Sequence, residues 1–241
     1  KGEAGADGMS SFQALATAIA AQVGTGNIAG AATALAIGGP GAIFWMWIAA
    51  FLGMATIYAE AIMAQKYKTV GADGQVTGGP VYYIRAAFKG TFGKVLAGIF
   101  AILITLALGF MGNAVQSNSI AAAFHTAFGI PQWIMGLVVA VIAIFVFMGG
   151  MKRIAKVTET IVPFMAALYI IGSLIVIIYN YKNIPYAFAS IFVGAFAPQS
   201  VVGGAAGATV KLALTKGVAR GLFSNEAGMG STPHAHAQAH V

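Results

Sequence analysis

The chain has 241 residues, of which 59% are hydrophobic and only 8% are charged. About a quarter of the residues of an ordinary soluble domain are charged, so this composition excludes a water-soluble globular protein and indicates one that lies in lipid. The net charge of +7 does not indicate nucleic-acid binding, because the basic residues lie beside the apolar runs and form no basic face interleaved with aromatic residues.

Six hydrophobic segments are predicted along the chain. In order, they cover residues 10–37, 41–64, 94–124, 132–150, 154–179 and 205–241. The longest uninterrupted runs can cross about 30 Å of hydrocarbon at about 1.5 Å per residue. The sequence therefore predicts an all-α fold, a polytopic transmembrane helical bundle.

The basic residues between these segments predict the orientation of the chain in a membrane. The connection after the second segment and the sequence GGMKRIAK after the fourth are rich in Lys and Arg, whereas IGGPG and HTAFGIPQ have none. Because basic loops lie in the cytoplasm, we expect a multi-pass protein of the cell membrane, inner or plasma, whose chain enters the first segment from the cytoplasm. Three basic residues on the expected outer side are an exception to this pattern: Lys211, Lys216 and Arg220.

The first and sixth segments are interrupted by glycines and polar residues, at 24–28 in QVGTGNIAG and at 224–231 in SNEAGMGS. Interrupting a helix in lipid exposes N–H and C=O groups, each of which costs several kcal/mol if it finds no partner. Two breaks separated by five spans predict the first five-helix inverted repeat plus part of the sixth, discontinuous helix. For the first break alone, close helix packing through Gly26 and Gly30 is the alternative explanation.

The breaks supply groups that fit a zwitterion and a hard cation. N–H groups at the start of a half-helix suit a carboxylate, whereas freed carbonyl oxygens and the side-chain oxygen of Asn27 suit Na⁺.

Other polar residues have two explanations each. Asn113 and Gln116 lie three residues apart on one face of the third segment, where they line a substrate path or bond a neighbouring helix. Glu226, the only acid in either break, caps the half-helix that follows or takes part in proton coupling. His234 and His236 lie on different sides of a helix, so they predict no metal site, and the absence of catalytic motifs predicts a protein that is not an enzyme.

Three stretches resemble motifs of the sodium:alanine symporter family. GGPGAIFWMWIAAFLG, residues 38–53, is similar to the signature of that family, and SSFQALATAIAAQVGTGNIAG and GVARGLFSNEAGMGS are similar to its other strong motifs. The resemblance covers essentially the whole chain. It implies that residues 1–241 form a partial transporter domain with the leucine-transporter-type fold of the APC superfamily, which has two five-helix inverted repeats.

The same resemblance implies a secondary active transporter for the Na⁺-coupled symport of small neutral amino acids, alanine and glycine, into the cell. The implied partners are the amino acid, Na⁺ and the lipid bilayer, with no nucleic acid and with no cofactor besides Na⁺ as the coupling ion. The alternatives are a proton-coupled amino-acid transporter of the same fold and, from another class, an ion channel.

The sequence GTGN also resembles, more loosely, the GLGN break of the leucine-type transporters. That likeness implies a substrate carboxylate on the N–H groups of Thr25 and Gly26. The implied Na⁺ ligands come from Ala20, Gln22, Val23, Asn27 and Ser224. The other implied substrate residues are Phe223, Ser224, Asn225, Gly228, Asn113 and Gln116, with Asn27 shared between substrate and cation. Because Gly26 and Gly228 have no side chain, we expect a pocket with room for little more than a methyl group.

Overall fold

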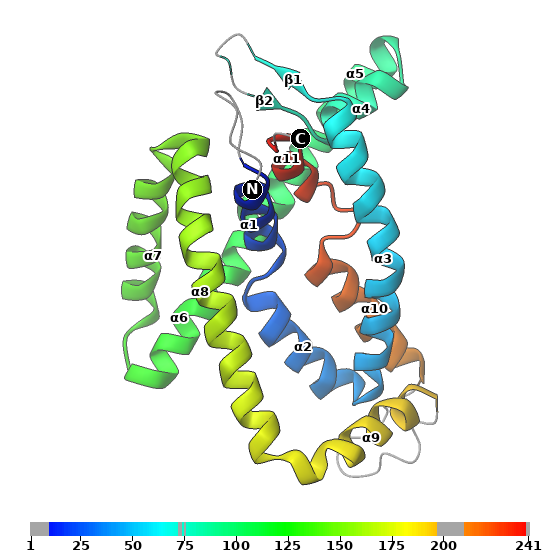
Figure 1. Ribbon diagram of the computed structural model, residues 1–241, viewed down its shortest axis with the longest axis vertical. Coiled ribbons are helices and arrows are strands. Elements are labelled where there is room, and N and C mark those ends of the chain that lie inside the picture. The colour runs from blue at the N-terminus through cyan, green and yellow to red at the C-terminus, as the bar shows by residue number, and fades with distance from the viewer. Residues whose placement is uncertain (1–9, 72–73, 75, 197–209, 240–241) are drawn as a thin grey trace. The chain divides into compact units, whose positions relative to one another are not determined.

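The computed structural model of the protein describes residues 10–71, 74, 76–196 and 210–239 (Figure 1). These residues form two compact units. The first unit contains the described parts of Lys1–Thr25, Ile57–Val162 and Met229–Val241, and the second contains those of Gly26–Thr56 and Pro163–Gly228. Of the predicted sixth segment, residues 205–209 and 240–241 lie outside the described part of the chain.

The first unit is helical apart from one small hairpin. Its elements are α1 (Ser11–Gln22), β1 (Thr69–Val70), β2 (Val76–Thr77), α4 (Pro80–Ala87), α5 (Gly90–Ile104), the π-helix η1 (Thr105–Gly112), α6 (Asn113–Phe128), α7 (Gln132–Phe147) and α11 (Thr232–Ala237). It also holds the end of α3 (Gly41–Lys66) and the beginning of α8 (Gly150–Tyr179). The two strands pair antiparallel with Thr69 opposite Thr77, an addition to the all-α fold that the composition predicts.

The second unit contains α2 (Thr25–Gly38) beyond its first residue, the first part of α3, the rest of α8, the 3₁₀ turn η2 (Tyr181–Asn183), α9 (Ile184–Phe196) and α10 (Val210–Asn225). Here α10 packs closely along α3. A Cβ atom on Gly221 would lie 2.8 Å from the Cβ of Ala49, a distance that real Cβ atoms essentially never show. The close approach of α3 and α10 therefore requires glycine at position 221.

Three helices among the described residues are long and apolar enough to cross a membrane: Gly41–Lys66, Gly90–Phe128 and Lys152–Tyr179. Gln132–Phe147 is a shorter apolar helix. Large hydrophobic side chains on these helices point outward, for example Phe145, which is 68% exposed, and Ile178, which is 69% exposed. Outward-facing apolar surface of this extent is stable in hydrocarbon and not in water, which confirms the prediction of an all-α membrane protein.

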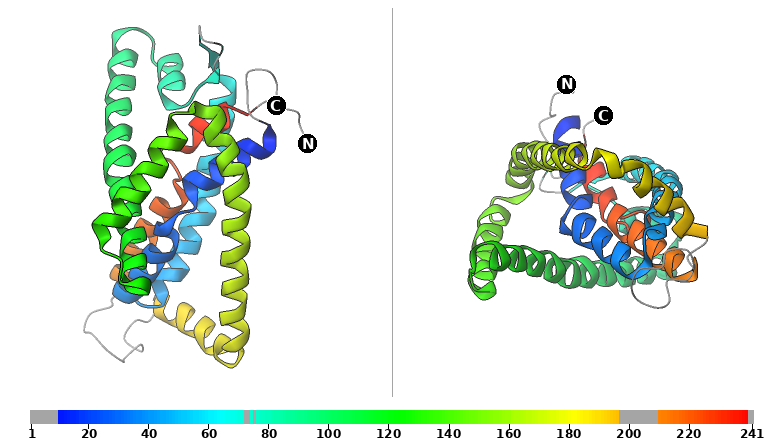
Figure 2. Two further views of the ribbon diagram at one scale, coloured as in Figure 1. Left: turned by 90° about the vertical axis from the view of Figure 1, so that its left-hand side faces the viewer. Right: turned by 90° about the horizontal axis from the view of Figure 1, so that it is seen from below.

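The helix that covers the third predicted segment is continuous from Gly90 to Phe128 and contains the π-helical stretch Thr105–Gly112 (Figures 1 and 2). A π-helix is wound more widely than an α-helix, is rare, and frequently lies at functional sites. Gln116 lies one turn beyond this stretch, in α6.

Candidate functional site

The first break lies between α1 and α2. A capping box starts α1, in which the Gln13 N–H donates to the Ser10 hydroxyl and the Ser10 N–H donates to the Gln13 side chain. The helix ends at Gln22, and Val23 takes an extended conformation while its N–H donates to the Ile19 carbonyl at 2.7 Å. Because α2 begins at Thr25, the helical path is interrupted at Val23 and Gly24.

In the first unit, Gln116 of α6 contacts this break directly. Its Oε1 accepts a hydrogen bond from the Thr25 N–H at 3.1 Å and another from the Thr25 hydroxyl at 2.6 Å. The contact needs glycine at position 24, since a Cβ there would lie 2.9 Å from the same Oε1 atom. The Thr25 N–H, which the sequence predicts to donate to a substrate carboxylate, therefore donates to the Gln116 amide oxygen in this structure.

The second predicted residue of α6, Asn113, does not contact the break. Its side-chain Nδ2 donates to the Gly109 carbonyl at 3.0 Å, one turn earlier in the π-helical stretch, and the residue is exposed. Of the two side chains predicted to line a substrate path, the structure brings Gln116 to Thr25 and turns Asn113 back onto its own helix.

Gln22 connects the two broken segments within the first unit. Its Nε2 donates to the hydroxyl of Thr232 at 3.3 Å, and Thr232, the first residue of α11, is fully buried. The helices α1 and α11 lie side by side in Figure 1, as their residue contacts require. Ala20 lies in the last turn of α1, where backbone carbonyls lack a partner further along the helix.

In the second unit, α2 and α10 run antiparallel and meet near both breaks. The Asn27 side chain donates from Nδ2 to the Ser224 carbonyl at 3.3 Å. The Ser224 side chain is buried, and its hydroxyl makes no hydrogen bond with any described residue. Three turns further along α2, Gly38 packs against Ala213, which fixes the antiparallel direction.

The second break follows α10, which ends at Asn225, and precedes α11, which begins at Thr232. Glu226 has φ 51°, and Gly228 and Gly230 each have φ 81°. These left-handed conformations are ordinary for glycine and uncommon for any other residue, so Glu226 holds a strained backbone. The predicted substrate residue Phe223 lies in the last turn of α10, and its side chain lies outside the described atoms.

The predicted site residues thus fall into two groups. Within the first unit the structure brings together Gln22, Thr25 and Gln116, and within the second it brings Asn27 to Ser224. Thr232 was not predicted from the sequence motifs. Its position at the start of the half-helix after a break is the signal that could have found it, since side-chain oxygens at such positions cap exposed N–H groups.

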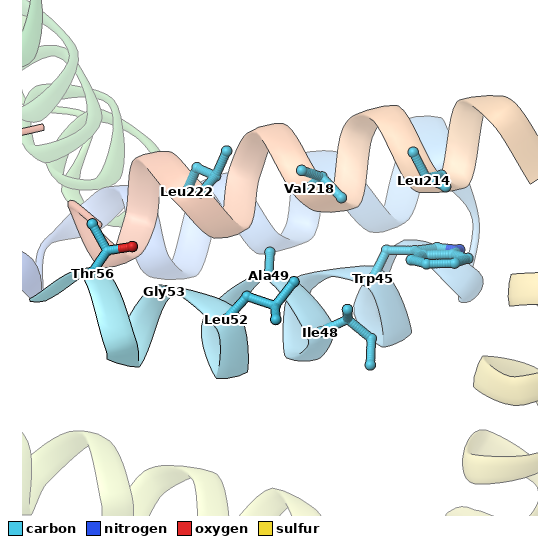
Figure 3. A pocket seen from close by; sticks show the side chains of 9 residues that line it. All are labelled: Trp45, Ile48, Ala49, Leu52, Gly53, Thr56, Leu214, Val218 and Leu222. Atoms are coloured by element: carbon cyan, nitrogen blue, oxygen red, sulfur yellow. The ribbon is translucent and has the colours of Figure 1, made fainter. Parts of the chain in front are cut away.

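A groove of about 320 Å³ lies between α3 and α10 in the second unit (Figure 3). Its walls are almost wholly apolar and consist of Trp45, Ile48, Ala49, Leu52, Gly53, Thr56, Leu214, Val218 and Leu222. A zwitterion needs polar partners for both of its charges, because burying an unpaired charge is costly. The groove therefore does not fit an amino acid.

Protein carboxylates and imidazoles do not gather into a metal site anywhere in the described residues, where no group of three His, Cys, Asp or Glu side chains lies close enough to hold an ion. The breaks also hold neutral oxygens, those of the backbone, of Asn27 and of Ser224. Neutral oxygens are ligands that suit hard cations.

Three long apolar helices define a membrane protein. Two further helical segments, α1 with α2 and α10 with α11, are interrupted at polar residues and glycines. The whole chain, residues 1–241, matches the model of the sodium:alanine symporter family. The chain belongs to this family.

Several curated relatives are similar to the chain over nearly all of its length. The sodium/alanine symporter AgcS of Methanococcus maripaludis is 48% identical over 232 residues, which are 96% of this chain and 50% of AgcS. The "Probable sodium/glutamine symporter GlnT" of Bacillus subtilis is 47% identical over 231 residues, 96% of this chain and 47% of GlnT. The amino-acid carrier protein AlsT of the same organism is 46% identical over 238 residues, 98% of this chain and 49% of AlsT. The chain spans about half the length of these relatives.

Proposed function

We propose that this protein is a secondary active transporter that carries a small neutral amino acid, alanine or glycine, into the cell together with Na⁺. The observation that carries the proposal is the contact of Gln116 with Thr25. Two donors of Thr25, its N–H and its hydroxyl, point to one amide oxygen. Family membership supports the same class of activity, and the name of AgcS supports alanine as the substrate.

A substrate carboxylate is a better acceptor for these two donors than a neutral amide. Hydrogen bonds to an ionised acceptor are roughly twice as strong as those between neutral groups. In this proposal the carboxylate replaces the Gln116 oxygen on Thr25, and the Gln116 NH₂ group donates to the carboxylate. Before the substrate binds, Gln116 thus accepts the hydrogen bonds of the two Thr25 donors. This lowers the free-energy cost of leaving those donors without a partner.

The end of α10 supplies groups of the opposite polarity. The carbonyls of Phe223, Ser224 and Asn225 lie in its last turn, where the helix dipole carries partial negative charge. In this proposal they accept the substrate ammonium group. The glycine at position 228, one turn beyond, leaves room beside the Thr56 methyl group, which a Cβ at 228 would approach to 3.4 Å.

Na⁺ coupling is supported by the buried hydroxyl of Ser224. A buried hydroxyl with no hydrogen bond costs about 1–3 kcal/mol, so its presence favours a ligand that the bare chain lacks. The Asn27 side chain donates a hydrogen bond from Nδ2 to the Ser224 carbonyl. A cation would therefore bind through the other side-chain atom, the Oδ1 oxygen. The carbonyls of Ala20, Gln22 and Val23 at the end of α1 are the other proposed Na⁺ ligands.

We also propose that the chain has the leucine-transporter-type arrangement, with α1 and α2 as the broken first helix of one five-helix repeat and α10 and α11 as its counterpart in the next. Support comes from two interruptions with similar anatomy, each a helix end followed by glycine and then a new half-helix. The multi-pass topology in the cell membrane belongs to this proposal.

The identity of the substrate side chain is the part of this proposal that the relatives support least. Relatives named for alanine and for glutamine are almost equally similar to this chain, at 48% and 47% identity, so overall identity does not choose between them. We propose a side chain no larger than a methyl group from the glycines at positions 26 and 228, although a Cβ on Gly26 would meet nothing within 4 Å. The gain from burying a methyl group is about 0.8 kcal/mol, so alanine and glycine should differ only modestly.

Uptake of labelled alanine into liposomes that contain the full-length protein tests this function. We expect accumulation that needs an inward Na⁺ gradient and stops when choline replaces Na⁺. Accumulation that persists in choline and stops when a protonophore collapses the proton gradient would establish the proton-coupled alternative. Ion current without any amino acid present would establish the channel.

A further inference from the structure

Two basic residues of α10 have no part in the proposed function. Lys216 and Arg220 lie four residues apart, on one face of the helix, and both are half-buried. They lie on the side of the membrane that the sequence predicts to be outside, where the preference of basic residues for the cytoplasm does not account for them.

The Arg220 side chain extends across α10 onto α2, close to the first break. Its Cδ and Nη1 each lie 3.5 Å from the position that a Cβ would take on Gly30. Gly30 is three residues beyond Asn27 and shares its face of α2, and Arg220 is one turn before Ser224 on α10. Arg220 and Gly30 thus each lie about one helical turn along their own helix from a residue of the Asn27–Ser224 contact.

The Arg220 guanidinium is not paired with a carboxylate in the described part of the second unit. Glu226 is the only acid among those residues, and it lies six positions further along, past the end of α10 and on another side of it. Within the described residues Arg220 forms neither an ion pair nor a hydrogen bond. The last turn of α10, just beyond Arg220, carries partial negative charge that offsets only part of a full positive charge, and the start of α2 carries partial positive charge. An anion that arrives at this position would be bound by a guanidinium group that has no other partner.

We infer that Arg220 is a specificity-determining residue that binds the carboxylate of the incoming amino acid as it approaches the break. A guanidinium group presents paired donors that match a carboxylate, and it keeps its charge at any physiological pH. Lys216, one turn further out, extends the same attraction. This inference rests on the proposed function, because it takes the break to be where the amino acid binds.

The test compares alanine with alaninol, which keeps the methyl and ammonium groups and lacks the carboxylate. The full-length protein is reconstituted as wild type, Arg220→Gln and Arg220→Lys. Lys211→Gln is the matched control, because Lys211 is an exposed cation of the same helix. Uptake kinetics give KM and the maximal rate for alanine, and competition gives the ratio of the alaninol and alanine inhibition constants.

Arg220→Gln should raise KM by about tenfold or more, since a hydrogen bond to a charged group is worth about 1.5–3 kcal/mol. The maximal rate should change much less. The ratio of the alaninol to the alanine inhibition constant should fall in Arg220→Gln, because only alanine loses a carboxylate contact. It should fall less in Arg220→Lys and stay unchanged in Lys211→Gln. An unchanged KM, or an equal weakening of alanine and alaninol, would overturn the inference and leave Arg220 a packing residue.

Two further results keep the inference and the proposed function apart. If Arg220→Gln does not insert as a monodisperse protein, Arg220→Lys decides alone, because a flexible ammonium group keeps the charge and loses the paired geometry. The ratio of inhibition constants does not depend on the coupling ion. Wild-type uptake that is independent of Na⁺ would therefore overturn the proposed coupling while the carboxylate test still gives its answer.

Discussion

The Oε1 atom of Gln116 accepts hydrogen bonds from both the N–H and the hydroxyl of Thr25, at 3.1 Å and 2.6 Å. The two residues are 91 positions apart in the chain, and Thr25 is the first residue of α2 after the interruption. A side chain from another helix thus satisfies donors that a broken helix exposes in lipid. Any ligand that binds to the Thr25 N–H must displace this oxygen.

Gln116→Glu should raise the KM for alanine uptake by about tenfold or more, because a carboxylate beside Thr25 repels the carboxylate of the substrate. Asn118→Asp is the matched control, since it adds the same charge to α6 at an exposed position. Uptake kinetics with the full-length protein measure the effect. Equal KM values for Gln116→Glu and wild type would mean that the substrate carboxylate binds away from Thr25.

Gly24→Ala should destabilise the protein by roughly 1–3 kcal/mol, because the new methyl group overlaps the Gln116 amide. Gln116→Ala in the same chain removes the overlap and should recover most of the loss, which a double-mutant cycle of thermal unfolding measures. Gly98→Ala is the control, since a Cβ there meets no described atom within 4 Å. Additive effects of the two substitutions would show that the strain at position 24 comes from the backbone.

Ser224→Ala tests whether the buried Ser224 hydroxyl binds Na⁺ or binds nothing. If Ser224 binds Na⁺, its loss should raise the Na⁺ concentration for half-maximal uptake by about fivefold or more, as should Asn27→Ala, because each removes an oxygen ligand from the site. If the hydroxyl binds nothing, Ser224→Ala should leave the Na⁺ dependence unchanged and leave stability equal or slightly higher, because a buried polar atom without a partner is removed. The initial rate of uptake against Na⁺ concentration distinguishes the two outcomes.

Glu226→Gln should leave uptake largely intact and with the same pH dependence as wild type, because an amide oxygen still accepts hydrogen bonds from backbone N–H groups. The position keeps its left-handed backbone, φ 51°, in both proteins, so the comparison isolates the charge. Uptake is measured across pH at saturating Na⁺. Loss of proton-driven accumulation with alanine binding retained would instead assign proton coupling to Glu226.

Glu159→Ala should lower stability by about 1–3 kcal/mol, because the Glu159 Oε2 accepts a hydrogen bond from the Gln13 Nε2 at 3.0 Å between α8 and α1. Glu159→Gln keeps an acceptor oxygen and should lose less. Heat-induced aggregation of the purified protein measures both. Equal losses in the two variants would show that the negative charge, and not the hydrogen bond, stabilises this contact.

The sequence by itself determined that the protein is a helical membrane protein, and it predicted interruptions at 24–28 and 224–231; in the structure α2 already begins at Thr25. Apolar runs long enough to cross a membrane show directly in composition, because the cost of exposing them to water does not depend on what they pack against. The break before Thr25 and the one after Asn225 are also local, since glycines and exposed backbone groups mark them within a few residues.

Only the tertiary structure decided which polar side chains contact the residues at the breaks. Asn113 and Gln116 look equivalent in sequence, three residues apart in one apolar helix, yet Gln116 contacts Thr25 while Asn113 donates to Gly109 of its own helix. A side chain reaches its partner only through the packing of helices that are distant in the chain. The position of Arg220 likewise depends on packing. The sequence shows the charge, but only the antiparallel packing of α2 and α10 brings the Arg220 side chain against Gly30, about one turn along α2 from Asn27.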